Sequence, residues 1–537
     1  MTTFNLIDEP WIIVFARDGS IAERSIRDVL LGADEVASIG GDIPTQQFAI
    51  ARLLLAIVRR AVDWTPDPLQ RWSELWTDGA LPHNEINAYL DRVHDRFDIC
   101  DPKRPFYQVA DFHTAKGEVK PVTLVVSDVP AGYPYFTTRA GSGAARLPLA
   151  EAARWIVHTQ AYDTSGIKTG DPRDPRTKGG KGYPIGIAWC GQLGGILAET
   201  TDLARTLLLN TPLRTSTTPL TIEGDSPCWE RDHLGIWPRD NVTPSGPIDL
   251  LTWQSRRIKV VFDEDQAVGV LVGNGDPLEP FAQLGIEHLS GWRFSDQQSK
   301  KRGGDTYYPR TFDADRSVWE GFENLLLQTS EDGNRGKCAA LFDWLDLLVD
   351  KRVLNTSFVV TPHIFGLRYD TQSSIIGASI DDRIAMRVAN FGSDGCRRVA
   401  VEAAAAAGRV ARVIGQLAKN LAQAAGGVGD TDEKAARMQF LSRLDVSYRA
   451  WLLDLGVGDV DEHLIAWHRM LHRSALADGA LLVMSAGRPA FVGRVVTSSS
   501  RKPLWLDAAR SELFFRTALN REVPGAFIED KEKTDAR

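Results

Sequence analysis

The fold of the C-terminal part of the chain is decided by the stretch TDEKAARMQFLSRLDVSYRAWLLDLG, residues 431–456. Thr431, at its start, is a typical helix-capping residue. Large apolar residues then recur at helical spacing: Leu441, Leu444, Tyr448, Trp451 and Leu455. This periodicity predicts an amphipathic helix that buries one face.

Three further helical segments surround this one. The sequence predicts helices at about 378–425, 460–485 and 503–520. Glycine-containing stretches separate the segments, as at Gly426-Gly427 and Gly456. Four amphipathic helices joined by mostly short links predict an all-α four-helix bundle over residues 377–537.

The N-terminal part mixes strand and helix signals. Residues 11–15 followed by Asp18-Gly19 predict a hairpin, because Asp-Gly readily adopts the positive φ angles of a tight turn. Pro44 opens a predicted helix that runs through Val62. Runs of β-branched residues predict strands at 122–126, 258–262 and 268–272. The predicted fold class is α+β: a mixed α/β N-terminal domain, residues 1–376, followed by the four-helix bundle.

The composition is that of a globular protein. Of the 537 residues, 43% are hydrophobic and 25% charged, which argues against a largely disordered chain. The five cysteines are scattered and form no CxxC motif. This pattern is typical of a protein without disulfides in a reducing cytoplasm. The first residues lack a signal-peptide pattern, and the longest apolar run, 48–58, contains Arg52. We therefore expect a cytoplasmic protein without a membrane span.

The charge is unevenly distributed along the chain. Its 62 basic and 70 acidic side chains give a net charge of −8, and residues 381–537 hold 23 basic and 20 acidic ones. Residues 1–380 hold the other 39 and 50, so a net charge of −11 is followed by one of +3. The overall charge argues against nucleic acid as a partner, but local basic segments decide this question.

Sequence motifs of catalysis are missing. The segment GKC at 336–338 departs from a phosphate-binding loop, which ends in Ser or Thr and has a glycine where this chain has Glu331. His468 and His472 are four residues apart on a predicted helix and could face one metal, but no third ligand is evident. This favours a binding protein without metal or cofactor. A metal-dependent nuclease with scattered carboxylates is an alternative.

Three polar segments of the N-terminal part are candidates for nucleic-acid contact. Residues 165–181 contain five basic and two acidic side chains and four glycines, which let backbone amides approach a phosphate or a base edge. Residues 297–304, QQSKKRGG, carry three consecutive cations. Residues 366–375, GLRYDTQSSI, predict an exposed turn whose polar tip could unstack a base step. Taken singly, each segment is more often a solvated surface turn.

These three segments, in this order and after the opening FNLIDEPWI at residues 4–12, resemble the large subunit (CasA family) of the type I-E CRISPR surveillance complex, Cascade. The resemblance covers essentially the whole chain. It implies a subunit that is not an enzyme and that reads the protospacer-adjacent motif (PAM) of double-stranded DNA from the minor groove. It also implies that the subunit starts strand separation and helps to recruit the helicase-nuclease.

The resemblance assigns the residues of the DNA site. Gln372 matches the glutamine wedge of the family, with Thr371 and Ser373 beside it. The remaining assignments are the lysine finger at Lys301, or at Lys300 in the alternative register, and the glycine loop at Ser165 and Gly166 with Lys168 close by. This chain departs from the family pattern here, because a Gly-Gly pair of some relatives is Ser-Gly and the insert DPRDPRTK, residues 171–178, follows.

Two more features follow from the resemblance. Phe136 and Arg139 lie in the segment that resembles the contact to the 5′ handle of the CRISPR RNA. Some relatives carry a cysteine cluster with zinc spacing, of which this chain has only Cys228, so no zinc is expected. The implied partners are target DNA, CRISPR RNA, the backbone and small subunits of Cascade, and the helicase-nuclease.

The first predicted bundle helix is rich in cations. They outnumber Glu402 along its length: Arg397, Arg398, Arg409, Arg412 and Lys419. They could guide DNA or contact neighbouring subunits, and a solvated helix face is an equally good interpretation for any one of them. A scaffold subunit that bridges its neighbours without touching DNA is the other alternative function.

Overall fold

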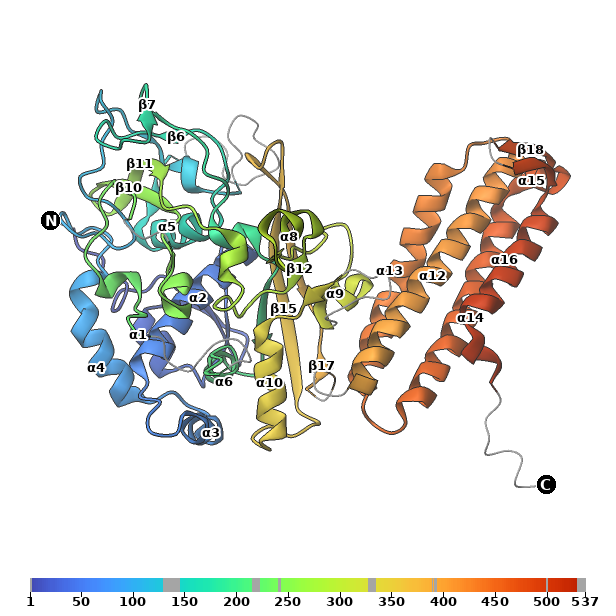
Figure 1. The fold of residues 1–537 in the computed structure, drawn as a ribbon, viewed down its shortest axis with the longest axis horizontal. Helices are drawn as coiled ribbons and strands as arrows, with labels where there is room; N and C mark the ends of the chain where they lie inside the picture. Colours follow the sequence, from blue (N-terminus) through green and yellow to red (C-terminus); the bar gives the residue numbers. More distant parts are fainter. Residues whose placement is uncertain are drawn as a thin grey trace. The chain divides into compact units, whose positions relative to one another are not determined.

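The chain forms two compact units in the computed structural model (Figure 1). The described residues are 2–128, 145–214, 223–239, 243–326, 335–388, 390, 394–498 and 501–528. The first unit comprises Met1–Asp315, Leu327–Val353 and Val360–Arg383, and the second comprises Arg316–Leu326, Leu354–Val359 and Ile384–Arg537. The division expected between residues 376 and 377 falls inside strand β16 (Ile375–Arg383), so the first unit extends seven residues further.

Helix α2 (Pro44–Ala61) is the central helix of the first unit. Proline at its first position is preorganised for a helix, and all residues from Thr45 to Val58 are buried. It packs against α5 (Leu149–Tyr162). The predicted helix from Pro44 to Val62 is confirmed. The other helices of this unit are α1 (Ile26–Leu31), α3 (Pro68–Asp78), α4 (His83–Val93), α6 (Leu203–Leu209), α7 (Pro247–Leu251), α8 (Asp296–Arg302) and α10 (Ala340–Asp350).

The strands of the first unit form small antiparallel sheets. The first sheet has the order β2 (Ile21–Arg24), β1 (Ile12–Ala16), β3 (Val36–Ile39), which confirms the predicted hairpin. The others are β10 (Arg256–Asp263) with β11 (Gln266–Asn274), β4 (Lys120–Pro121) and β5 (Leu147–Pro148); β13 (Tyr307–Pro309), β12 (Trp292–Phe294) and β14 (Gly336–Lys337); β6 (Lys168–Thr169), β8 (Lys181–Gly182) and β7 (Thr177–Lys178); and β16, β15 (Val359–Asp370) and β9 (Gly195–Glu199).

Two of the three predicted strands of β-branched residues are confirmed, in β10 and β11. The prediction of a strand at 122–126 is wrong, because residues Val122–Val125 form a 3-10 turn. Val122 and Val125 are both buried. A strand would direct residues three apart to opposite faces, whereas the tight helical turn directs both to the core.

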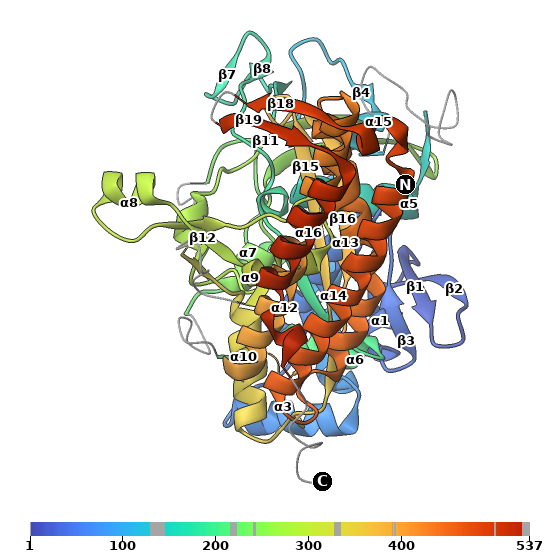
Figure 2. The same cartoon turned by 90° about the vertical axis from the view of Figure 1, so that its right-hand side faces the viewer.

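The second unit contains the predicted bundle, formed by α12 (Asp394–Ala425), α13 (Asp430–Asp454), α14 (Val460–Ser485) and α16 (Ala508–Glu522). Figure 2 shows these helices running alongside one another. The unit also contains α9 (Glu323–Leu326) and β17 (Met386–Arg387), and α15 (Gly487–Val492) and the hairpin β18 (Arg494–Ser498)–β19 (Arg501–Leu506) cover one end. No described helix is both long and apolar enough to cross a membrane.

The first bundle helix begins at residue 394, not at 378 as expected. Residues 375–383 instead form β16, whose partner β15 lies directly before it in the chain. The fourth helix likewise begins at 508, after the unpredicted hairpin β18–β19. In the bundle core Trp319 stacks on Tyr448 with ring centroids 4.6 Å apart, and Tyr448 meets Trp467 edge-on at 5.4 Å.

Candidate nucleic-acid interface

The hairpin β15–β16 ends in a tight polar tip, residues 371–374. Thr371, Gln372 and Ser373 all have left-handed backbone angles, with φ of 42°, 55° and 60°. Such angles are uncommon for residues other than glycine and require surrounding support. The Ser374 N–H and Oγ–H both donate to the Thr371 carbonyl, at 3.1 and 2.7 Å. The tip therefore presents an exposed Gln372 on a closed turn.

The end of the hairpin next to the tip is held by Tyr369. Its hydroxyl donates to the Tyr162 carbonyl at the end of α5, over 2.6 Å. There is no room for a side chain at Gly191, where a Cβ would lie 2.4 Å from the Tyr369 Oη atom. Burial raises the pKa of Tyr369 well above its ordinary value, so the phenol stays neutral. These contacts fix the direction in which the tip projects.

The structure brings the glycine loop, residues 163–170, to the hairpin tip. The Ser165 N–H donates to the Ser373 carbonyl over 2.8 Å. Gly166 has a φ of 133°, which favours glycine, and a Cβ there would meet no atom within 4 Å. Two of the predicted DNA-contacting segments are thus joined directly, backbone to backbone.

A buried ion cluster lies beneath the glycine loop. The Asp163 carboxylate pairs with Lys168 at 2.6 Å and with Arg256. Burial alone would raise the pKa of Asp163, but the two cations lower it overall. Burial lowers the pKa of Lys168, although Asp163 favours its charged form. The Lys168 side chain is only 12% exposed, so the structure favours a role in shaping the loop over the expected DNA contact.

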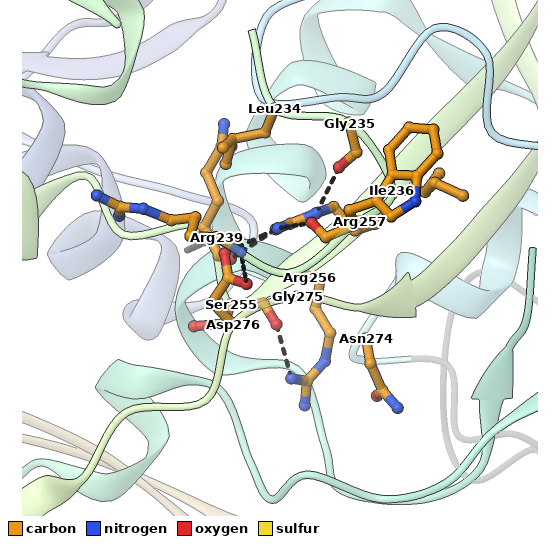
Figure 3. A network of polar contacts seen from close by, with 12 residues as sticks. Leu234, Gly235, Ile236, Arg239, Ser255, Arg256, Arg257, Asn274, Gly275 and Asp276 are labelled. Atoms are coloured by element: carbon orange, nitrogen blue, oxygen red, sulfur yellow. Dashed lines mark hydrogen bonds and ion pairs between the residues drawn. The ribbon is translucent and has the colours of Figure 1, made fainter. Parts of the chain in front are cut away.

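Arg256 holds the loop from below. Its guanidinium donates to the Thr164 carbonyl at 3.0 Å and to the Gly186 carbonyl at 2.8 Å. Its neighbour Arg257 serves the opposite side, donating to the Gly235 carbonyl and to Asp276, both at 2.8 Å (Figure 3). Successive residues of a strand point to opposite faces. One end of β10 therefore supports both the glycine loop and the residues around Gly235.

Helix α8 carries the three consecutive cations of the second segment. It leaves the sheet between β12 and β13 and projects from the first unit, as Figure 2 shows. Lys300 pairs with Asp296 at 2.6 Å, and the Arg302 guanidinium lies 3.6 Å from the centroid of the Phe281 ring. Lys301 is exposed and has no ion-pair partner within the described residues. Of the two predicted registers, this geometry favours Lys301 as the available cation.

Most of the bundle cations are neutralised within the second unit. Arg398 pairs with Asp461 at 3.5 Å, Arg409 with Glu402 and Glu522, and Lys419 with Asp430 and Glu433 at 2.7 and 2.9 Å. Arg412 is exposed, and Arg397 is half-buried. Three of the five cations, Arg398, Arg409 and Lys419, are therefore paired with carboxylates of their own unit.

Two candidate metal ligands of the sequence lie in the second unit. The Nδ1 atom of His468 accepts the Gly525 N–H at 3.2 Å, and His472 contacts Asn520 at 3.1 Å. The described residues contain no group of three or more His, Cys, Asp or Glu side chains placed to hold a metal ion. Phe136 and Arg139 lie outside the described residues.

Two positioning residues of the site are not evident from the sequence. Tyr369 lies inside the segment GLRYDTQSSI, but nothing in its neighbours distinguishes an inward phenol from an exposed one. In the sequence, Arg256 is a polar residue at the start of a predicted strand. Its partners Asp163 and Gly186 lie 93 and 70 residues away in the chain. Only the fold brings these partners together.

Comparisons with known proteins agree with the fold. The family model described as CRISPR-associated protein Cse1 matches residues 5–477. The crystal structure of Thermobifida fusca Cse1 has a TM-score of 0.90 and 39% identity, over 97% of this chain and 98% of that one. CasA/Cse1 of Thermus thermophilus is 28% identical over 354 residues, which span 62% of this chain and 66% of that protein. A chain of a CRISPR RNA-guided surveillance complex shares the fold, with a TM-score of 0.71 and 17% identity over 97% of this chain and 100% of that one.

Proposed function

The chain belongs to the CRISPR-associated Cse1 (CasA) family, and from this premise we propose that it is the non-catalytic, DNA-binding large subunit of a type I-E Cascade complex. In this proposal it recognises the PAM of double-stranded DNA from the minor groove and inserts Gln372 to start R-loop formation. Its partners are the CRISPR RNA 5′ handle, the other Cascade subunits and the helicase-nuclease that it helps to recruit. The family membership itself confirms the resemblance noted in the sequence.

The single observation that carries the proposal is the hydrogen bond from the Ser165 N–H to the Ser373 carbonyl. It unites the glycine loop and the wedge tip as one surface. A base step that the loop contacts is therefore adjacent to the side chain that would separate it. The minor groove distinguishes mainly A·T from G·C, so such a reader tolerates several motifs. The full sequence is then read by pairing with the guide RNA.

The stiffness of the tip supports the wedge role. Unstacking a base step costs a few kcal/mol, which contacts to the opened duplex must offset. A flexible tip would add an ordering cost on insertion, of about 1–2 kcal/mol for each backbone residue fixed. The left-handed turn at residues 371–373 and the Tyr369 contact fix the tip before DNA arrives.

The test replaces Gln372 with Ala in the assembled surveillance complex. Loss of about 1.4 kcal/mol of the compensating contacts slows duplex opening about tenfold. Opening is measured by the fluorescence of 2-aminopurine placed at the first base pairs beside the PAM. Assembly with the guide RNA and the other subunits is expected to be unchanged.

The matched control is Gln416→Ala, which removes an exposed glutamine of α12 in the second unit. It is expected to open targets at the wild-type rate. Normal opening by Gln372→Ala would contradict the wedge. Normal opening together with an absence of crosslinks from residues 165–166, 301 and 371–373 to DNA would favour the scaffold alternative.

A further inference from the structure

The insert that follows the glycine loop forms a small sheet together with the residues on either side of it. β6 pairs with β8, and β8 pairs with β7, so residues 168–182 form a three-stranded sheet that lies at the top of the first unit in Figure 1. β6 is the end of the glycine loop itself. The sheet therefore extends the surface formed by Ser165, Gly166 and the wedge tip.

The arginines of the insert are used internally. In each of the two Asp-Pro-Arg triplets the aspartate accepts the backbone N–H of its own arginine at 2.9 Å and its Nε–H at 3.0 Å: Asp171 with Arg173, and Asp174 with Arg176. Arg173 also pairs with Asp111 at 2.6 Å. These cations stiffen the connection and are not available to an outside anion.

The sheet is fixed to the end of β11. Arg176 donates to the carbonyls of Gly275 at 2.6 Å and Asn274 at 3.1 Å. The Asn274 amide donates to the Tyr183 carbonyl at 2.6 Å, directly after β8. The hairpin β7–β8 is thus held at both of its ends by one strand of the main body.

The hairpin β7–β8 exposes a pair of lysines. Lys178 and Lys181 lie opposite each other in the β7–β8 register, on either side of a two-residue turn. The turn residues Gly179 and Gly180 have φ of 59° and 73°, as the tightest hairpin turns require. Both lysines are exposed, and neither has an ion-pair partner within the described residues. Like charges directly opposite each other destabilise a sheet, so the pair lowers the stability of the hairpin that carries it.

We propose that Lys178 and Lys181 form a clamp that binds the phosphate backbone of duplex DNA beside the PAM. This inference rests on the proposed function and adds a second contact to it. Lys181 pairs with Thr169, four residues after Ser165, so at about 3.4 Å per residue and about 5 Å between paired strands its backbone lies within about 19 Å of Ser165. The side-chain-free turn lets a backbone approach closely, and adjacent phosphates supply the two negative charges that offset the repulsion.

A phosphate clamp has a distinct signature. It contacts no base, so its loss weakens binding equally for duplexes with and without the PAM. Each phosphate contact contributes about 0.9 to the slope of log affinity against log salt. The guide RNA offers the same phosphate chemistry, so the experiment includes RNA loading as a separate measurement.

The experiment compares complexes that contain wild-type chain, the double variant K178Q/K181Q and the matched control K103Q/K351Q, which removes two exposed lysines outside the insert. Affinity for a PAM-containing and a PAM-free duplex is measured over a salt series. The double variant is expected to bind both duplexes on the order of tenfold more weakly, with a slope lower by about 1.8. K178R/K181R is expected to restore the slope, and the control to leave it unchanged.

The outcomes separate this inference from the proposed function. The double variant removes a repulsion, so its unfolding temperature should equal or exceed that of the wild type, and misfolding does not obscure the result. An unchanged salt slope overturns the clamp, and so does a loss of bound guide RNA without a change in DNA affinity. If Gln372→Ala still slows duplex opening about tenfold in that case, the proposed function stands; if it does not, both proposals are wrong.

Discussion

His158 is a buried histidine at the contact between α2 and α5. Its Nε2 atom lies 2.9 Å from the Thr45 hydroxyl, and its Nδ1 atom lies 3.3 Å from the Ser127 hydroxyl. Burial lowers the pKa of His158 to about 3, despite the nearby Asp163 and Asp42. Burial also lowers the pKa of His288 to about 3, and neighbouring Arg59 acts in the same direction. Both rings are therefore neutral in the folded first unit at neutral pH.

This burial predicts that acid destabilises the first unit. In the unfolded chain a histidine binds a proton below its ordinary pKa of about 6.5, whereas the folded rings stay neutral down to about pH 3. The free energy of unfolding should therefore fall as the pH drops through this window, by on the order of 1 kcal/mol per histidine at pH 5.5. Urea unfolding at pH 7.5 and 5.5 measures the loss.

The variant His158→Gln keeps groups that can bond both hydroxyls but cannot take up the proton. Between the two pH values the variant should lose less unfolding free energy than the wild type, and the difference should equal the contribution of one histidine, on the order of 1 kcal/mol. His83→Gln, at an exposed position of α4, is the control. An equal loss of unfolding free energy in His158→Gln and in the wild type would contradict the prediction, because uptake of a proton by His158 on unfolding would then contribute nothing to the pH dependence.

At the scale of the element, α8 shows how a helix selects one of three adjacent cations. Lys300 lies four residues after Asp296, and this spacing places the two side chains on one face. Arg302 turns onto the Phe281 ring. Gly303, with a φ of 74°, then ends the helix. Lys301 is exposed, has no ion-pair partner within the described residues, and is the cation available to an outside phosphate.

From the geometry of α8 we expect unequal effects when Lys300 and Lys301 are replaced. Lys301→Ala in the assembled complex should weaken binding to a PAM-containing duplex several-fold and lower the salt slope by about 0.9. Lys300→Ala removes an exposed pair of small energy and should leave the slope nearly unchanged. Affinities at several salt concentrations decide the matter. A larger effect of Lys300→Ala would place the finger in the other register.

Elements with local signals are predictable from the sequence. A proline at the first position predicts α2, and regular apolar spacing predicts α13. The structure confirms both helices. The strand β16 has the sequence IIGASIDDR, whose pattern is weak, and only pairing with β15 makes it extended. The site follows the same rule. Its segments can be named from the resemblance, but the bond between Ser165 and Ser373 joins residues too far apart in sequence for any local signal.

At the scale of the whole molecule, neither unit is a continuous piece of chain. The second unit includes Arg316–Leu326, which precede the bundle by many residues. From this segment Trp319 stacks on Tyr448, and its indole N–H donates to Asp445 at 2.8 Å. Trp319 and Phe322 are fully buried. The bundle core is therefore completed by residues outside residues 377–537.

This arrangement predicts that Trp319→Ala destabilises the second unit. Removing a fully buried tryptophan typically costs about 3–5 kcal/mol. Hydrogen exchange of the α13 amides in the full chain should become correspondingly faster. Trp505→Ala, at an exposed position of the same unit, is the control and should change exchange little. Equal exchange in both variants would mean that the bundle does not depend on this segment.

The interleaving of the two units also sets an order of events during synthesis. Trp319 and Tyr448 are 129 positions apart. At about 5–20 residues per second, a ribosome needs roughly 6 to 26 seconds between them. During that interval all segments of the first unit, which end at Arg383, can emerge and fold, while the indole of Trp319 waits without its stacking partner. A nascent chain of this protein therefore exposes the aromatic side chains of residues 316–326 while its first unit is already folded. Exposed aromatic surface of this kind is what chaperones bind.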